Sequence, residues 1–163
     1  MQDFSVTLSI DGLASTAALG EAIANSVSAG TTLGLVGTLG AGKTNLSQAI
    51  AVACGVPASA ATSPTFVLCQ VYHADRTIYH LDAYRITDDD EFIELGVEEM
   101  FASDALTLVE WADRVESVLP RDRITIQIEI SGTQTRRVTL TSAVDQKATL
   151  LAIQAAWQSK LST

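Results

Sequence analysis

The chain has 163 residues, of which 47% are hydrophobic and 18% are charged, a composition typical of a globular protein rather than a disordered one. This length predicts a single compact domain over residues 1–163, large enough to bury a core. Nineteen acidic residues outweigh ten basic ones, which gives a net charge of −9. Proteins that grip nucleic acid unaided normally carry a basic face that neutralises phosphates, so strong direct binding to nucleic acid is not expected.

The sequence also limits where the protein works. It has no apolar run of membrane-spanning length, and its first five residues lack the basic start and apolar stretch of a signal peptide. The two cysteines, Cys54 and Cys69, have neither metal-binding nor redox spacing, and we interpret both as buried free thiols. These features predict a cytoplasmic protein without a membrane partner.

The chain is expected to begin with a strand and a helix. Residues 4–10 alternate apolar and polar side chains, as a half-buried strand does. Ser15 or Thr16 can cap the helical pattern that follows, and Gly30 can close it.

The next segment carries the clearest functional signal. Residues 37–44, Gly-Thr-Leu-Gly-Ala-Gly-Lys-Thr, match the phosphate-binding pattern G-x-x-x-x-G-K-[ST] without a mismatch. They stand between an apolar run at 32–36, typical of a buried strand, and a helical pattern at 45–53, as the motif requires. The glycines let the backbone N–H groups turn inward around a phosphate. The residues expected to hold the nucleotide here are Gly37, Leu39, Gly40, Ala41, Gly42, Lys43 and Thr44.

Two of these side chains have specific tasks in such a loop. Lys43 brings a positive charge to the β- and γ-phosphates, and Thr44 offers a hydroxyl to a magnesium ion. The loop therefore predicts binding of a nucleoside triphosphate with Mg²⁺.

A hydroxyl-rich loop follows at the end of a stretch of small residues. Thr62, Ser63 and Thr65 fit an ordinary turn whose hydroxyls satisfy backbone groups, and they equally fit a switch segment that approaches the γ-phosphate or the metal. The residues alone leave both interpretations open.

The second half of the chain continues the mixture of strands and helices. Two strand-like runs at 67–72 and 77–82 are separated by a hairpin turn, and Asp88 caps a helical stretch at 91–101 that contains Gly96. The remaining elements are a strand at 105–109, a helix at 112–119, paired strands at 123–130 and 137–141, and a helix at 144–161. This order predicts an α/β fold similar to phosphate-loop NTPases, with a mixed central sheet and flanking helices.

Two carboxylates follow apolar strand residues, as a magnesium-binding phosphate-loop enzyme requires. Asp82 ends one strand and Glu110 ends another, and both are candidate catalytic residues that hold the metal directly or through water. The sequence leaves open which is nearer to magnesium. Arg85 fits either a phosphate contact or a surface ion pair, and Trp111 fits either a core position or a partner anchor. His73 and His80 lack ligand spacing, and we assign them no role.

Five motifs of this chain resemble the bacterial TsaE family, once called YjeE, the small ATPases of the tRNA threonylcarbamoyladenosine pathway. The resemblance spans about residues 5–140. The motifs are Gly-Thr-Leu-Gly-Ala-Gly-Lys-Thr at 37–44, Ser-Pro-Thr-Phe at 63–66, His-Leu-Asp-Ala-Tyr-Arg at 80–85, Glu-Leu-Gly at 94–96 and Val-Glu-Trp-Ala at 109–112.

The resemblance implies an ATPase that assists two partner proteins, TsaB and TsaD, of which TsaD transfers threonylcarbamoyl to tRNA; contact with tRNA would be indirect. It implies that Asp82 is the Walker-B-like aspartate, that Glu110 is the second magnesium-side carboxylate, and that Trp111 is a functional tryptophan. Tyr84 and Arg85 would lie on the same side as Trp111. Finally, the resemblance places Thr16 near the adenine and Arg136 near the nucleotide.

Three functions of other classes would also use a phosphate loop. A small kinase would share the phosphate loop but needs an arginine-rich lid, for which the ten dispersed basic residues give no sign. A GTPase needs a guanine-reading segment such as Asn-Lys-x-Asp, which the sequence lacks. A nucleotide-dependent interaction module with negligible turnover alone also fits, since a partner could complete the catalytic site.

Overall fold

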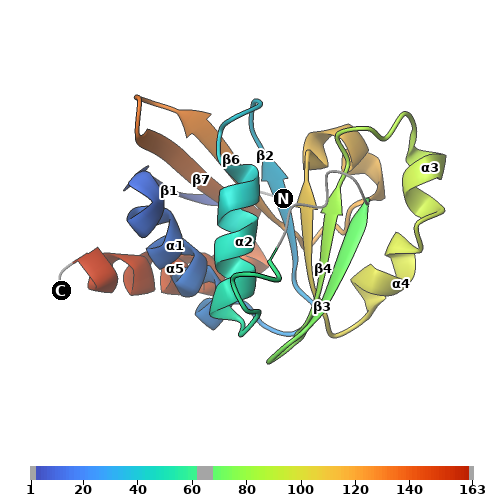
Figure 1. The fold of residues 1–163 in the computed structure, drawn as a ribbon, viewed down its shortest axis with the longest axis horizontal. Coiled ribbons are helices and arrows are strands. Elements are labelled where there is room, and N and C mark those ends of the chain that lie inside the picture. The colour runs from blue at the N-terminus through green and yellow to red at the C-terminus, as the bar shows by residue number, and fades with distance from the viewer. Residues whose placement is uncertain (1–2, 62–67, 162–163) are drawn as a thin grey trace.

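A seven-stranded mixed sheet forms the centre of the molecule (Figure 1). The computed structural model describes residues 3–61 and 68–161. In these ranges the strand order is β1-β7-β6-β2-β5-β4-β3, with β6, β2, β5 and β4 running parallel and the outer pairs antiparallel. The strands are β1 (Asp3–Asp11), β2 (Thr32–Val36), β3 (Cys69–His73), β4 (Thr77–Asp82), β5 (Leu106–Glu110), β6 (Ile124–Ile130) and β7 (Thr135–Ala143).

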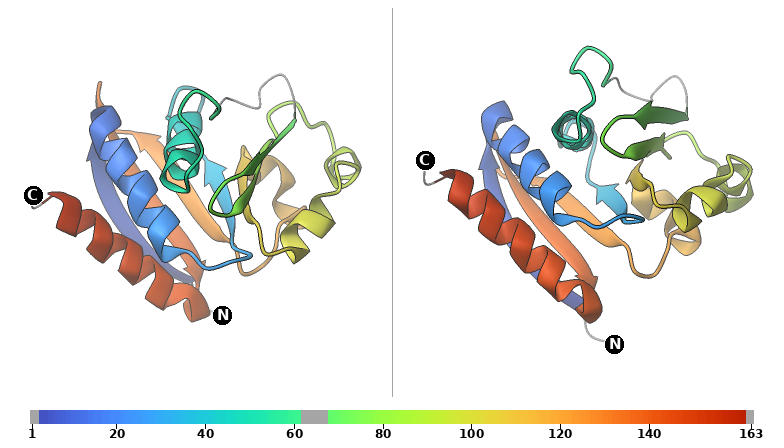
Figure 2. Two further views of the ribbon diagram at one scale, coloured as in Figure 1. Left: turned by 60° about the horizontal axis from the view of Figure 1, so that its bottom comes forward. Right: turned by 90° about the horizontal axis from the view of Figure 1, so that it is seen from below.

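Helices cover both faces of this sheet. They are α1 (Gly12–Ser26), α2 (Lys43–Ala53), α3 (Asp89–Ile93), α4 (Val97–Ala102), the 3₁₀ segments η1 (Ala112–Val118) and η2 (Val144–Gln146), and α5 (Lys147–Leu161). One buried cluster joins α1, α2 and α5 to β1, β2, β6 and β7, and Figure 2 shows α1 and α5 side by side. A second cluster joins α3, α4 and η1 to β4 and β5. The expected α/β fold is therefore confirmed.

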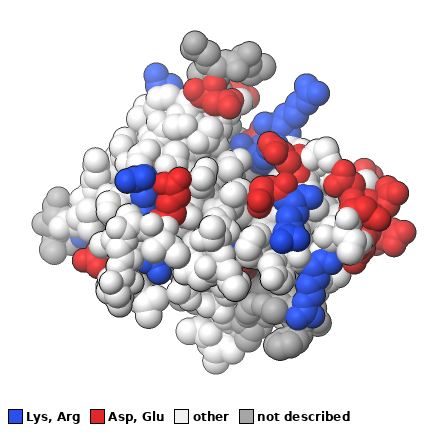
Figure 3. All heavy atoms as spheres, turned by 90° about the horizontal axis from the view of Figure 1, so that it is seen from above, with Lys and Arg blue, Asp and Glu red and all other residues white. Residues whose placement is uncertain are grey.

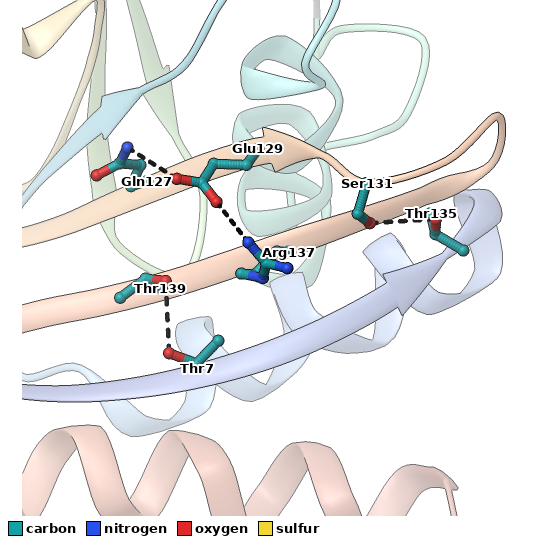
Figure 4. A network of polar contacts seen from close by, with 7 residues as sticks. All are labelled: Thr7, Gln127, Glu129, Ser131, Thr135, Arg137 and Thr139. Atoms are coloured by element: carbon teal, nitrogen blue, oxygen red, sulfur yellow. Dashed lines mark hydrogen bonds and ion pairs between the residues drawn. The ribbon is translucent and has the colours of Figure 1, made fainter.

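The alternation of residues decides which face of the sheet is covered. Within three strands, over residues 6–10 of β1, 124–128 of β6 and 138–140 of β7, apolar buried residues alternate with polar ones. The polar face carries a surface network in which Arg137 pairs with Glu129 at 3.1 Å and Thr7 lies 3.5 Å from Thr139 (Figure 4). Such exposed contacts contribute little stability. This half of the sheet therefore has its helices on one face.

The first helix begins earlier than the sequence indicates, and the expected cap at Ser15 or Thr16 is wrong. The helix starts at Gly12, whose N–H donates to the Gln134 carbonyl at 2.9 Å in the β6–β7 hairpin. The Thr16 hydroxyl instead donates to the Gly12 carbonyl at 3.0 Å, inside the first turn. Contact with the hairpin thus decides where the helix begins.

Two further helical expectations need correction. The stretch 91–101 is two helices, because Gly96 has φ of 84°, a left-handed conformation that ends α3 and starts α4. Asp88 does cap α3, since its Oδ1 accepts the Glu91 N–H at 2.8 Å. The segment after Trp111 is a 3₁₀ helix with a kink at Val115, where φ is −130°, rather than an α-helix.

The other expected elements are close to those observed. The strand at residues 32–36 is β2, and β6 and β7 pair antiparallel as expected. The last helix buries Leu150, Ile153 and Trp157 on one face. Cys54 is a buried thiol, but Cys69 is half-buried because β3 is the edge strand, and both are unpaired. Within residues 3–61 and 68–161, no helix has the length and apolar character needed to cross a bilayer.

Candidate functional site

The loop between β2 and α2 has the backbone of a phosphate cradle. Gly40 and Gly42 have φ of 81° and 111°, values that side-chain-bearing residues rarely adopt. Gly42 directly precedes α2, so the free N–H groups of the helix N-terminus open onto the loop. Such an arrangement attracts an anion through the backbone dipoles.

Lys43 is folded back into this loop. Its Nζ donates to the carbonyls of Gly37 at 2.6 Å and Thr38 at 3.0 Å, and only 5% of the residue is exposed. Burial lowers the pKa of Lys43, while the nearby carboxylates of Glu110, Asp113 and Asp82 act in the opposite direction. The lysine is thus an enclosed cation held by the loop that it would serve.

A cavity of about 290 Å³ lies between this loop and the ends of two strands. Its walls bring together residues that are far apart in the sequence, from the phosphate loop, from the end of β4 and from the end of β5. The lining residues are Leu39, Gly40, Gly42, Lys43, Thr44, Asn45, Asp82, Tyr84, Glu110 and Trp111.

The two strand-end carboxylates stand side by side on the cavity wall. Asp82 and Glu110 are paired residues of the parallel strands β4 and β5, so both lie at the carboxyl edge of the sheet, as the sequence predicts. The Thr44 hydroxyl donates to Glu110 Oε1 at 2.6 Å, and the Tyr84 N–H donates to Asp82 Oδ1 at 2.9 Å. Burial raises the pKa of Asp82; the Tyr84 N–H lowers it and the Glu110 charge adds to the rise.

These groups have the chemistry of a magnesium site. A threonine hydroxyl and two carboxylates are oxygen donors, which Mg²⁺ prefers, and they meet beside the phosphate cradle. In the described parts of the chain, no group of three or more His, Cys, Asp or Glu residues could hold a metal by itself. The donor set thus fits a magnesium ion that also takes phosphate oxygens.

His80 is a site residue that the sequence reasoning missed. It is 1% exposed, and its Nε2 lies 2.5 Å from Glu110 Oε2, opposite the oxygen that Thr44 contacts. The signal was the alternation of β4, because residues 80 and 82 share one face of the strand. Metal-ligand spacing gives no sign of this relationship, because Glu110 is thirty residues away, on another strand.

Trp111 does not point away from Glu110, as continued strand geometry would require. The strand ends at Glu110, and Trp111 has φ of 59°, a left-handed conformation that returns its ring to the same cavity. The half-buried ring lies 3.9 Å from Lys43 Nζ and 4.9 Å from the Tyr84 ring, and the exposed Arg114 guanidinium lies near both rings. Tyr84 and Trp111 therefore form an aromatic wall at the mouth of the cavity.

A second cavity, of about 130 Å³, lies on the other side of the phosphate loop. Thr16 and Arg136 both line it, together with Ala41 of the loop. Arg136 Nε donates to the Ala41 carbonyl at 2.9 Å, and its Nη1 donates to the carbonyls of Gly132 and Thr135. The β6–β7 hairpin thereby braces the loop.

Of the remaining sequence candidates, the structure places only Arg85. Arg85 is exposed, and it is absent from the lining of both cavities among the residues that the structure describes. Thr62, Ser63 and Thr65 lie outside the described residues. Figure 3, which views the edge toward which β2 and β4 point, shows acidic side chains gathered at the end that carries α3. On this face basic side chains lie beside acidic ones rather than in a continuous stripe.

Comparisons with known proteins agree with this geometry. A family model described as "Threonylcarbamoyl adenosine biosynthesis protein TsaE" matches residues 10–138. The tRNA threonylcarbamoyladenosine biosynthesis protein TsaE of Treponema pallidum is 34% identical over 125 residues, covering 77% of this chain and 92% of that protein. The Bacillus subtilis protein of the same name is 38% identical over 114 residues, covering 69% and 70%. The crystal structure of Bacillus subtilis YdiB superposes with a TM-score of 0.80 at 27% identity, over 95% of this chain and 97% of that one.

Proposed function

This chain belongs to the TsaE family of threonylcarbamoyl adenosine biosynthesis proteins, and we propose that it is a magnesium-dependent ATPase subunit. In this proposal it assists a complex of TsaB and TsaD in forming threonylcarbamoyladenosine in tRNA. The names of its relatives assign them to tRNA threonylcarbamoyladenosine biosynthesis. ATP and tRNA are both cytoplasmic, and this is the compartment we propose.

One observation carries the proposal. The Thr44 hydroxyl, at the start of α2, donates to Glu110 at the end of β5, so the phosphate loop and a strand-end carboxylate form one wall of the cavity. A loop that binds only phosphate does not need this pairing. A loop that binds phosphate together with a divalent cation does, because the hydroxyl and the carboxylate serve the same ion.

The residues of the loop divide the work of binding ATP. The backbone N–H groups around Gly40 and Gly42 would receive the phosphates. Lys43 would exchange the neutral carbonyls of Gly37 and Thr38 for negatively charged phosphate oxygens, so both partners of the new contact would be charged and it would be stronger than the bonds it replaces. Thr44 and Glu110 would hold magnesium, which supplies positive charge that neutralises the phosphate oxygens during transfer.

The second cavity supports a place for the rest of the nucleotide. Thr16 and Arg136 line it, and it borders the phosphate loop at Gly40 and Ala41. We assign the adenosine side of ATP to this region. Arg136 also keeps the loop in shape through its bond to the Ala41 carbonyl.

Catalysis and partner contact are assigned to the opposite wall. Asp82, whose burial raises its pKa, lies beside Glu110 and would orient the attacking water or the hydration shell of the metal. Tyr84 and Trp111 are large aromatic side chains at the cavity mouth, and tyrosine and tryptophan are enriched at binding hot spots. We assign TsaB and TsaD contact to this wall. Roles for Arg85 and for the loop with Thr62, Ser63 and Thr65 stay predictions.

Phosphate release tests the proposal. The purified chain is incubated with ATP and magnesium, alone and with TsaB and TsaD, and the assembled complex is also assayed for threonylcarbamoyladenosine in tRNA. We expect ATP hydrolysis that rises in the complex, together with modified tRNA that depends on ATP. Phosphorylation of a small acceptor without phosphate release would indicate a kinase instead. Binding of ATP with no turnover under any condition would indicate an interaction module.

A further inference from the structure

His80 is buried behind the wall of the candidate site: it does not line the cavity itself, but it contacts Glu110, which does. It lies on β4, two residues before Asp82 and on the same face of the strand. Its Nε2 lies 2.5 Å from Glu110 Oε2, and 1% of His80 and 2% of Glu110 are exposed. The histidine therefore meets the carboxylate from the side away from Thr44.

We infer that His80 is a positioning residue that holds the Glu110 carboxylate in place for the magnesium ion. This inference rests on the proposed function, because it assigns Glu110 to the metal. Because a carboxylate only accepts hydrogen bonds, His80 Nε2 must carry the hydrogen and donate it.

The two contacts of Glu110 divide its oxygens between two tasks. Oε1 accepts the Thr44 hydroxyl at 2.6 Å and faces the phosphate loop, while Oε2 is taken by His80. With one oxygen held, the carboxylate cannot rotate about its last bond, and the other oxygen stays directed at the ion. Hydrogen-bond partners of this kind orient metal-binding carboxylates, and their loss typically costs about 10- to 100-fold in metal affinity or activity.

Because Glu110 is buried, its carboxylate needs the hydrogen bond from His80. Glu110 stands next to Asp82, a second acidic group, and both are removed from bulk water. A buried carboxylate without hydrogen bonds is strongly disfavoured. Thr44 must release or share its bond when magnesium arrives, so His80 is the partner that remains through the cycle.

The test measures how much magnesium strengthens ATP binding. Calorimetry gives the ATP dissociation constant of the full chain in EDTA and in excess magnesium, and the ratio of the two constants is the readout. His80→Leu removes the donor at similar volume, and His80→Gln restores an N–H donor at a comparable reach. Ile78→Ala is the control for lost stability, because Ile78 is fully buried on the same face of β4, two residues earlier.

We expect His80→Leu to lower the ratio by about 10- to 100-fold while leaving the dissociation constant in EDTA unchanged. His80→Gln should recover most of the ratio. Ile78→Ala should lower the melting temperature but leave the ratio unchanged. If His80→Leu does not fold, His80→Asn replaces it, because its shorter amide cannot reach Glu110.

Three results would overturn the inference. The first is a ratio of dissociation constants that stays unchanged in His80→Leu. The others are a fall in this ratio in His80→Gln, or in Ile78→Ala, as large as the fall in His80→Leu. If the unaltered chain gains nothing from magnesium, the proposed function itself fails before any variant is compared, so the two failures are distinguishable.

Discussion

The ammonium group of Lys43 lies 3.9 Å from the centre of the Trp111 ring. An ammonium group over the face of a tryptophan is attracted by the negative charge of the ring face, most strongly where water is excluded. The same group donates to the carbonyls of Gly37 and Thr38. If Lys43 moves to a phosphate, it must change its distance from the ring. The environment of the Trp111 ring therefore depends on the position of the Lys43 ammonium group.

Fluorescence can follow this movement in a chain with one tryptophan. The sequence has two, and Trp157→Phe removes the other, whose buried Nε1 has no hydrogen-bond partner in the described structure. We expect ATP with magnesium to change Trp111 emission in this variant, because the cation beside the ring moves. The change should be lost when Lys43→Ala is added. Unaltered emission at ATP concentrations that calorimetry shows to be saturating would contradict the assignment of Lys43 to the phosphates.

Nucleotide affinity should depend on the Lys43 charge. Lys43→Ala removes a charge-assisted contact to phosphate, which should cost about 1.5–3 kcal/mol, or roughly one to two orders of magnitude in the ATP dissociation constant. Calorimetry with magnesium measures this constant. Lys147→Ala is the matched control, because it removes the same charge where the lysine lies over Phe4. Equal affinity in the two variants would show that residues 37–44 do not bind phosphate.

Local sequence patterns predicted the parts of the site that depend on strand and loop geometry. The pattern of residues 37–44 located the cradle, and the apolar runs ending in Asp82 and Glu110 placed both carboxylates at one edge of the sheet. Such information is local, because parallel strands that end in the same register bring their last residues together. Tertiary contacts decided the rest. The left-handed turn at Trp111 and the bond between His80 and Glu110 arise where separate elements meet.

Tertiary contacts also explain why some helix boundaries differ from those that the sequence predicts. Gly96 was expected inside one helix, yet its φ of 84° divides the segment into α3 and α4, which both contact β4 and β5 through one buried cluster. The start of α1 at Gly12 depends on the hairpin carbonyl of Gln134, which is distant in sequence. Neither contact leaves a periodic signal in the chain.

The stability of the chain without nucleotide should reveal the cost of burying Asp82. Burial raises the pKa of this carboxyl, so the folded chain keeps its proton at pH values where the unfolded chain has lost it. Stability therefore rises as the pH falls through the window between the unfolded and folded pKa values, and the penalty is complete above that window. Asp82→Asn removes the penalty and keeps an oxygen for the Tyr84 N–H. We expect a higher melting temperature at neutral pH and a gain that disappears in acid.

The control for this prediction is an aspartate without the same burial. Asp122 is exposed, so Asp122→Asn removes the same charge without relieving any burial and should not raise the melting temperature at neutral pH. Asp82→Asn should also weaken the effect of magnesium on ATP binding, because a neutral amide orients the hydration shell of the ion less strongly than a carboxylate does. A lower melting temperature at neutral pH would show that Asp82 stabilises the fold and is not held in place for function.

Trp111 and Trp157 offer a direct comparison between a site tryptophan and a core tryptophan. Trp157 is 6% exposed in the main core, and truncating such a residue to alanine costs about 3–5 kcal/mol. Trp111 is half-buried at the cavity mouth, so Trp111→Ala should cost about 1–2 kcal/mol. Alanine has a Cβ as tryptophan does and also disfavours a φ of 59°, so the substitution does not relieve the backbone strain. Trp111→Ala should therefore lower the melting temperature less than Trp157→Ala does.

Loss of Trp111 should reduce activity more than loss of Trp157, although it should reduce stability less. Trp111→Ala removes the ring that contacts Lys43 and Tyr84, so we expect it to abolish most of the ATP hydrolysis that depends on TsaB and TsaD. Trp157→Phe, which keeps the core filled, should retain that hydrolysis. The measurements are melting temperature, ATP affinity and phosphate release in the assembled complex. A fall in melting temperature equal to that of Trp157→Ala would make Trp111 a core residue. Full activity in the complex would mean that the aromatic wall has no part in partner-dependent turnover.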